Sequence, residues 1–395
     1  MAKKKEMTEI EKMELARALH NAHDWKDERI EREKKKENFV NSDDFLKRET
    51  ARVARERKSL GLEGLVGSLE AIIINTQEEH HKAAVEELLA TTGYHHNTSY
   101  LNKYFITSIL KLENSADIII RNRNNPGNPF QKYNLNPKSE YLPDTRLETF
   151  IFNSTDIASY YKIQKNRGIK FLTPYIVEYE NYLFIQSMPS EYTGISIGII
   201  QWKNNKGEYT SGKDTMLPWE FTKPLRPYLA NIGNLDHTAT RVRAQHRDPA
   251  IIEFMELTNY NFDFAIYVKS LNSITNVARL SSKDFAMVFT SGIAPFTNLE
   301  NSGPTEKYIY NYGARTHHMA FNTQNIEDVY QKLKNDGVKY LVELIGSPEE
   351  GLKQTFTIAS PNTLIVNEYI HRYGDFTGFF TRQNVTVLTG STNKQ

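Results

Sequence analysis

The chain has 395 residues, a length that predicts two or three domains, and its 49 basic and 48 acidic residues give a net charge of +1. This balance provides no overall field for binding nucleic acid or an anionic membrane surface. Cys is absent, which excludes disulfides, a thiolate nucleophile and Cys-ligated metal clusters, so any metal must be held by His, Asp or Glu.

The first 60 residues are rich in Lys, Arg, Asp and Glu and contain neither Gly nor Pro. This composition favours helix and ion pairs along the helix, and it predicts a charged helical extension over residues 1–64 that packs loosely on the body. The start of the chain lacks the apolar core of a signal peptide, and no apolar run approaches about 18 residues. We therefore expect a cytoplasmic protein with no membrane partner.

Two segments of the chain recur farther along it. Residues 67–94 align without a gap on residues 233–260, and each copy predicts a strand, a loop and an amphipathic helix. Residues 152–172 align in the same way on residues 321–341, and each copy begins with Phe-Asn and ends its helix near a Gly. The chain therefore contains a duplicated module with both strands and helices, which indicates the α+β class.

The duplication predicts how the domains are divided. A first module is expected over residues 65–213 and a second over residues 233–395. Between them, residues 214–232 include three prolines, which is typical of a linker.

Chemistry is expected where the two copies differ, because a packing role should occur in both. His237 lies on a predicted strand where the first copy has Ala71, and His318 lies on another where that copy has Thr149. Glu368 lies within an apolar strand, where a carboxylate is costly to bury unless it is paired or binds a metal. Two His and one carboxylate match the facial triad that holds non-haem Fe(II) and leaves coordination positions open.

Five motifs carry a resemblance to a known family. They are LDH at 235–237, HHMAF at 317–321, LKQTFT at 352–357, NEYIHR at 367–372 and GDFTGFF at 374–380. Together they resemble the vicinal oxygen chelate superfamily and, within it, the 4-hydroxyphenylpyruvate dioxygenase-like family. The resemblance covers about residues 65 to 380 and is weaker in the first module.

The resemblance implies a fold and an activity. The fold would be α+β, with two tandem vicinal-oxygen-chelate modules after the helical extension, each made of paired βαβββ units that form an open barrel. Only the second module would hold Fe(II), through His237, His318 and Glu368. The activity would be that of an Fe(II)-dependent dioxygenase that oxidatively decarboxylates a 2-oxo acid with O2. The resemblance assigns Gln354 to hydrogen-bond the acid, while Phe356, Phe376 and Phe380 pack against its tail.

Some residues depart from the family pattern. Family members that bind 4-hydroxyphenylpyruvate have polar side chains where this chain has Val277 and Gly292 or Ile293. We therefore expect a substrate with a less polar tail. The residue before His318 is His317, which strand alternation predicts to face away from the metal, so we expect it to have a structural role or to support the metal ligands from outside. The sequence after Phe380 predicts only a poor helix.

Other His residues are expected to be solvated. The doublets at 80–81 and 95–96 fall at a predicted helix start and in a predicted loop. Neither has a carboxylate at a spacing that suits a metal ligand, so neither predicts a second metal site.

Two other functions remain open. An extradiol-type ring-cleaving dioxygenase or a metal-dependent isomerase of the same superfamily is favoured by the short spacing between His318 and Glu368. It is opposed by the absence of an Asp-Pro-x-Gly pattern after Glu368. A non-catalytic binding protein with the same fold would be expected to have lost part of the triad. The identity of the 2-oxo acid and the formation of a homo-oligomer stay open.

Overall fold

The computed structural model describes residues 39–124, 127–374, 376 and 378–395. Most of the expected helical extension therefore lies outside the described residues. Within the part of the chain that is described, no helix combines the length and apolar character needed to cross a membrane.

The first sheet has nine strands in the order β6-β7-β8-β5-β1-β4-β3-β2-β9. Its strands are β1 (Val66–Asn75), β2 (His95–Leu101), β3 (Phe105–Lys111), β4 (Asp117–Arg123), β5 (Arg146–Ser154), β6 (Val177–Glu178), β7 (Tyr182–Gln186), β8 (Ser196–Trp202) and β9 (Thr215–Met216). Helices α3 (His81–Thr91) and α4 (Ile157–Asn166) belong to the same half of the molecule. The short strand β9 pairs with β2, so the first sheet reaches into the segment expected to be a linker.

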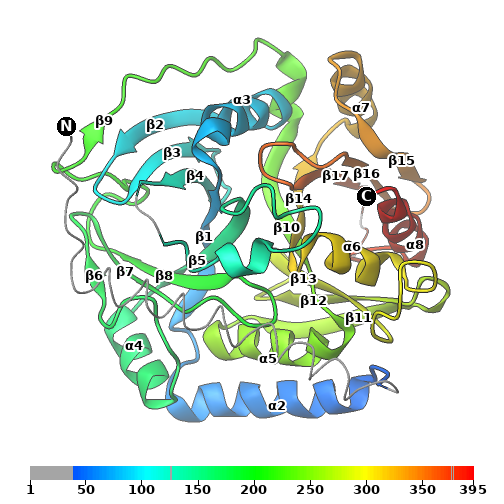
Figure 1. Ribbon diagram of the computed structural model, residues 1–395, viewed down its shortest axis with the longest axis horizontal. Coiled ribbons are helices and arrows are strands. Elements are labelled where there is room, and N and C mark those ends of the chain that lie inside the picture. The colour runs from blue at the N-terminus through cyan, green and yellow to red at the C-terminus, as the bar shows by residue number, and fades with distance from the viewer. Residues whose placement is uncertain (1–38, 125–126, 375, 377) are drawn as a thin grey trace.

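The second sheet has eight strands in the order β11-β12-β13-β10-β14-β17-β16-β15. Its strands are β10 (Ile232–Arg241), β11 (Asn261–Val268), β12 (Ser273–Arg279), β13 (Ala286–Gly292), β14 (Arg315–Thr323), β15 (Tyr340–Ser347), β16 (Leu352–Thr357) and β17 (Val366–Arg372). The accompanying helices are α5 (Arg247–Leu257), α6 (Pro304–Tyr312), α7 (Ile326–Asn335) and α8 (Arg382–Ser391). Figure 1 shows the two sheets side by side, each curved and flanked by its helices.

Each sheet consists of two βαβββ units joined edge to edge. In the first sheet β1 pairs antiparallel with β5, and in the second β10 pairs antiparallel with β14. The last strand of each unit returns parallel to its first strand, as β4 does to β1 and β17 does to β14. The repeats found in the sequence correspond to these units, and the predicted α+β fold of two tandem modules is confirmed.

The central strand pair of each module has three register irregularities at the same places, and two of them are bulges in which one extra residue has none opposite it. In the second module Asp236 is the extra residue on β10 and His317 is the extra residue on β14. In the first module the extra residues are Glu70 on β1 and Glu148 on β5. A bulge sets two neighbouring residues opposite one partner and re-aims their side chains, so strict alternation fails at these four positions.

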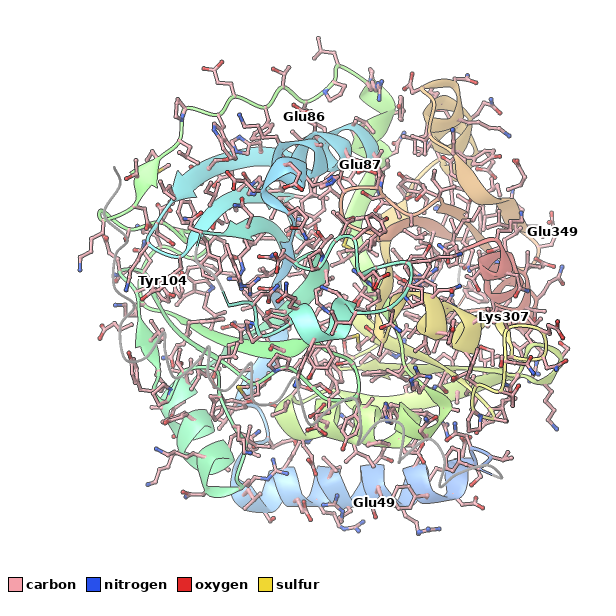
Figure 2. The ribbon with its side chains drawn as sticks, viewed as in Figure 1. Glu49, Glu86, Glu87, Tyr104, Lys307 and Glu349 are labelled. Carbon is pink, nitrogen blue, oxygen red and sulfur yellow. The ribbon has the colours of Figure 1, made fainter. Side chains whose placement is uncertain are left out.

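Helix α2 (Asp43–Leu60) packs against the second module, whereas the sequence predicted loose packing. It lies along α5 in Figure 1 and buries Leu46 and Val53. The Arg57 guanidinium is also buried, and it donates hydrogen bonds to the carbonyl oxygens of Met255, Thr258 and Tyr260 at the end of α5. Figure 2 labels Glu49 on this helix, where its carboxylate pairs with Arg52, and Arg52 also lies 3.5 Å from the Glu256 carboxylate of α5.

The segment after Phe380 forms helix α8, so the prediction of a poor helix there was wrong. The Thr381 hydroxyl accepts a hydrogen bond from the Asn384 backbone N–H, which caps the first turn. Val385 and Leu388 are buried, and α8 packs on β15 and β11. Tertiary packing therefore outweighs the low helix propensity of Val and Gly in this segment.

The prediction that His81 is solvated was also wrong. Its side chain is 1% exposed and hydrogen-bonds the Asn122 side chain and the Ser108 hydroxyl at 2.8 Å each. Burial lowers the pKa of His81 to about 4, against a smaller opposing effect of Asn122. His95 and His96 lie on β2 and not in a loop, and His95 is exposed.

The low pKa of His81 predicts a loss of stability in mild acid. The unfolded chain binds a proton near pH 6.5, whereas the folded chain binds it only near pH 4. Between pH 7 and pH 5 this difference removes about 2 kcal/mol of unfolding free energy. Urea unfolding of His81→Gln should therefore show a shallower pH dependence than that of the unaltered protein. The exposed-site control His95→Gln should keep the original dependence, and an unchanged slope in His81→Gln would contradict this account.

Candidate metal centre

The structure brings His237, His318 and Glu368 together on three adjacent strands. His237 of β10 pairs with Ala320 of the neighbouring strand β14, and Ala320 pairs in turn with Glu368 of β17. The potential ligand atoms of the three side chains all lie within 4.8 Å of one another. The imidazole Nε2 atoms of His237 and His318 are each 3.2 Å from Glu368 Oε2.

The potential ligand atoms of His237 and Glu368 are buried and, among the described residues, have no hydrogen-bond partner outside the cluster. His237 is 0% exposed and Glu368 is 1% exposed. Among the described residues, His237 Nε2 and both carboxylate oxygens of Glu368 have no hydrogen-bond partner. A buried carboxylate without partners is costly, and a divalent cation bound by the three side chains would remove that cost. The donor set therefore fits a metal that binds imidazole and carboxylate.

The charges around the cluster differ from one ligand to the next. Burial lowers the pKa of His237, but the charge of Glu368 and the hydrogen bond with Asp236 outweigh it and raise the pKa to about 9. Burial raises the pKa of Glu368 against the attraction of His237. Burial and the nearby His317 and His237 hold the pKa of His318 well below its ordinary value. The site therefore attracts positive charge to the Glu368 carboxylate, while His318 stays neutral and able to ligate.

Asp236 supports His237, and the sequence did not single it out as a site residue. Because Asp236 is the extra residue of the β10 bulge, its carboxylate lies beside the neighbouring imidazole, 2.7 Å from His237 Nδ1. Arg372 donates hydrogen bonds to both oxygens of Asp236, at 2.6 and 3.0 Å. A carboxylate on Nδ1 selects the tautomer that leaves Nε2 free to bind a metal.

His317 supports His318, which corrects the expectation that it faces away. The β14 bulge turns both His residues to the same side, and their Nδ1 atoms are 2.8 Å apart. The other nitrogen of His317 lies 2.8 Å from Gln395 Oε1. If His317 Nε2 donates to Gln395, its Nδ1 accepts from His318, and His318 Nε2 is then left to ligate.

The first module has no ligands at the equivalent positions. Ala71 and Thr149 take the places of the two His, and Gly198 pairs with Ile151 as Glu368 pairs with Ala320. A side chain at Gly198 would meet the Phe184 ring, whose Cε2 lies 2.9 Å from the place of a Cβ. The Gln186 amide donates to the Thr149 hydroxyl at 2.8 Å. The space that holds the cluster in the second module is therefore filled in the first.

The residues expected to contact substrate surround the cluster. The Phe356 ring lies 4.6 Å from that of His318, and the Phe380 ring lies 5.1 Å from that of His237. Phe376 packs with Phe380 against a small apolar cluster that includes Ile370. Gln354 pairs with Ile370 on the neighbouring strand and is fully buried. Neither amide atom of Gln354 has a hydrogen-bond partner among the described residues.

Asn384 is a second buried amide that the sequence reasoning missed. It is 1% exposed on α8, and neither atom of its amide has a partner in the described chain. One turn later on the same helix, Leu388 packs in a cluster with Phe356. The face of α8 that carries Asn384 is therefore turned toward the barrel. The only sequence signal was an Asn inside an otherwise apolar helix face, which a poor helix prediction obscured.

Val277 and Gly292 supply no side-chain hydrogen bond to this space. Val277 is buried in an apolar cluster with Phe379, and Phe264 and Phe380 pack against the same cluster. The backbone N–H of Gly292 is bound to the Glu306 carboxylate. The part of the β12–β13 wall that contains Val277, Ala286 and Val288 is therefore apolar.

No known protein family matches the sequence, and no curated protein matches it. Solved structures share the fold, among them the following two. A triple mutant of 4-hydroxymandelate synthase from Streptomyces coelicolor has a TM-score of 0.60 at 12% identity, covering 84% of this chain and 99% of that chain. A xylose isomerase-like TIM barrel/4-hydroxyphenylpyruvate dioxygenase fusion protein has a TM-score of 0.59 at 14% identity. That match covers 84% of this chain and 53% of the fusion protein. The chain thus shares the two-module α+β fold of these two structures.

The contact between Asp236 and His237 predicts a weaker metal site when it is altered. Replacing a group that orients a metal-ligating His lowers metal affinity by roughly 10- to 100-fold. Asp236→Asn should therefore weaken binding of Co(II) by this factor in an anaerobic absorption titration. Glu327→Gln removes a carboxylate that pairs with Lys353 and should leave the affinity unchanged. Equal affinities in Asp236→Asn and the unaltered protein would contradict the role of Asp236.

Proposed function

We propose that the second module is a non-haem Fe(II) dioxygenase that oxidatively decarboxylates a 2-oxo acid, with His237, His318 and Glu368 as the iron ligands. The observation that carries this proposal is the buried group of two imidazoles and one carboxylate, in which His237 Nε2 and the Glu368 carboxylate have no partner outside the group among the described residues. Two His and one carboxylate occupy three positions of an iron centre and leave the others for substrate and O2. When bound, Fe(II) would supply the redox chemistry.

Two further findings support this function. Both similar solved structures carry names of enzymes that belong to the resembled family, a 4-hydroxymandelate synthase and a 4-hydroxyphenylpyruvate dioxygenase fusion. The outer contacts of the two His residues are also complete, through Asp236 with Arg372 and through His317 with Gln395. A protein that had kept only the fold would have no need to preserve these contacts around an eroded site.

We propose that Gln354 and Asn384 hold the polar end of the substrate. Each amide is buried with its N–H and C=O unpaired, and a carboxylate or keto oxygen would satisfy the N–H donors. Phe356 and Phe380 flank the two imidazoles and exclude water from the bound acid, while Phe376 extends the apolar wall with Ile370. In this arrangement the two amides orient the bound acid, and the aromatic rings exclude water from it.

The remaining expectations stay predictions of the sequence. They are the module bounds 65–213 and 233–395, the cytoplasmic location, and the lack of nucleic-acid and membrane partners. The formation of a homo-oligomer stays open.

The proposed iron site predicts one Fe(II) per chain. His237→Ala, His318→Ala and Glu368→Ala should each weaken Fe(II) binding by more than about 100-fold. Loss of a residue that only orients a metal ligand already lowers metal affinity by roughly 10- to 100-fold, and each of these variants removes a ligand itself. Anaerobic metal analysis after gel filtration measures this. His95→Ala changes an exposed His of the first module and should bind one Fe(II). Two irons per unaltered chain would contradict the assignment of the metal to one module.

The activity is tested by O2 uptake and CO2 release from the Fe(II)-loaded protein on a panel of 2-oxo acids. Because the part of the β12–β13 wall around Val277 is apolar, phenylpyruvate or a branched aliphatic oxo acid should react at least as well as 4-hydroxyphenylpyruvate. O2 uptake with a catechol and with none of the oxo acids would favour ring cleavage and overturn the proposal.

The two buried amides predict a separation of activity from stability. Gln354→Leu and Asn384→Leu should each lower kcat/KM for the preferred oxo acid by about 10- to 100-fold, since a hydrogen bond to a charged group contributes roughly 1.5–3 kcal/mol. Neither variant should unfold more easily, because an apolar side chain replaces an unpaired buried amide. Thermal unfolding and steady-state kinetics measure both effects. A loss of stability with unchanged kinetics would assign the amides to packing.

A further inference from the structure

Two arginines cross between the modules at equivalent positions of the duplicated fold. Arg146 begins β5 and Arg315 begins β14, and both are buried. Arg146 Nη2 donates to the carbonyl oxygen of Ala314 at 2.9 Å, and Arg315 Nη2 donates to that of Thr145 at 2.7 Å. Each guanidinium therefore binds the backbone just before the other arginine, and two like charges are brought together at the junction.

A third buried cation joins this pair. Arg241 lies opposite Arg315 in the register of β10 and β14 and is 4% exposed. Its Cζ lies 4.8 Å from the centre of the Tyr308 ring, and its Nη1 donates to the Thr392 hydroxyl at 3.3 Å. Tyr308 is buried on α6 and lies within electrostatic reach of all three arginines.

These three arginines lack acidic partners. Within residues 39–124, 127–374, 376 and 378–395, no carboxylate forms an ion pair with Arg146, Arg241 or Arg315. Other buried arginines of the same molecule do have such partners. Arg247 pairs with two carboxylates, and Arg123 shares the buried carboxylate of Glu148 with a neighbouring arginine. Glu148 is thereby already neutralised.

Several hydrogen-bond donors of the group are also unused. Arg146 Nε, Arg315 Nε, Arg315 Nη1 and the Tyr308 hydroxyl are buried without a partner among the described residues. Burying a charge is costly unless a counter-charge or hydrogen bonds compensate it. Arg146 also donates to the Asn134 side chain and the Thr193 carbonyl oxygen, so that only its Nε is unpaired, whereas Arg315 leaves both Nε and Nη1 unpaired among the described residues. The group of three arginines and Tyr308 therefore lacks, within the described chain, a negative charge and enough hydrogen-bond acceptors.

We propose that a small anion binds at the junction of the two modules, among Arg146, Arg241, Arg315 and Tyr308. Guanidinium and phenol donors suit a halide or a small oxyanion such as phosphate, because both accept several N–H and O–H hydrogen bonds. Burial also lowers the pKa of Arg146 to about 9 and that of Arg241 to about 10, as expected for cations without a counter-charge. The site includes none of the three candidate metal ligands, although Tyr308 contacts His317, and the proposal does not rest on the proposed function.

The anion would tie the modules together near the metal centre. Its arginines come from β5 of the first module and from β10 and β14 of the second. The ring of Tyr308 lies 5.0 Å from that of His317, which contacts His318. Occupancy of the site should therefore stabilise the junction and the strand ends that carry these side chains.

Thermal unfolding of the full chain at constant ionic strength tests the proposal. Sodium chloride, sodium phosphate and sodium acetate are each exchanged against sodium gluconate, whose anion is too large for a buried site. At a hundredfold excess over its dissociation constant, the anion that binds should raise Tm by about 3 °C. The three salts distinguish a halide from an oxyanion. The same Tm in all four salts would overturn the proposal.

Two variants locate the site. Tyr308→Phe removes only the hydroxyl and should raise the anion concentration needed for the same increase in Tm by about tenfold. Arg315→Met should abolish the dependence of Tm on the anion. Arg279→Met changes an arginine that already pairs with Asp263 and should retain the full dependence. If Arg315→Met does not fold, Tyr308→Phe and a bromide-soaked crystal decide the matter. An anomalous peak beside Tyr308 supports the site, whereas an unaltered dependence in Tyr308→Phe together with a peak elsewhere refutes it.

Discussion

The arrangement of the metal centre depends on two β-bulges in the central strand pair of the second module. In a regular strand Asp236 would face away from His237, and His317 would face away from His318. The bulges give each ligand a neighbour on its own side, so that a carboxylate contacts one imidazole and a second imidazole contacts the other. The first module has the same bulges at Glu70 and Glu148, so they belong to the duplicated fold and not to the metal chemistry.

The two modules satisfy their buried polar groups in different ways. In the first, the bulge residue Glu148 is neutralised by Arg121 and Arg123, and the Phe184 ring fills the space next to Gly198. In the second, the Glu368 carboxylate has no Arg or Lys partner among the described residues and contacts only the imidazoles of His237 and His318. One copy of the scaffold is thus closed by its own side chains, while the other keeps a group that a bound cation can complete.

Helix α8 and the residues after it link the parts of the second module. Leu388 packs with Phe356, which lies against His318, and Thr392 accepts a hydrogen bond from Arg241. Gln395 completes the contact of His317. The same face of this segment carries Asn384 toward the barrel. The position of α8 therefore bears on the support of one ligand as well as on the wall of the substrate space.

The sequence alone determined the duplication, the α+β class and the three candidate ligands, because a ligand absent from one copy of a repeat stands out against residues that both copies need for packing. The alignment of His237 with Ala71 and of His318 with Thr149 follows from the sequence repeat alone. Only the tertiary structure decided which neighbours support them. Alternation predicts the wrong side for His317, since a bulge is created by the pairing of two distant strands and leaves no mark in the local pattern. The buried state of His81, the helix after Phe380 and the orphaned amide of Asn384 likewise follow from packing between segments far apart in the chain.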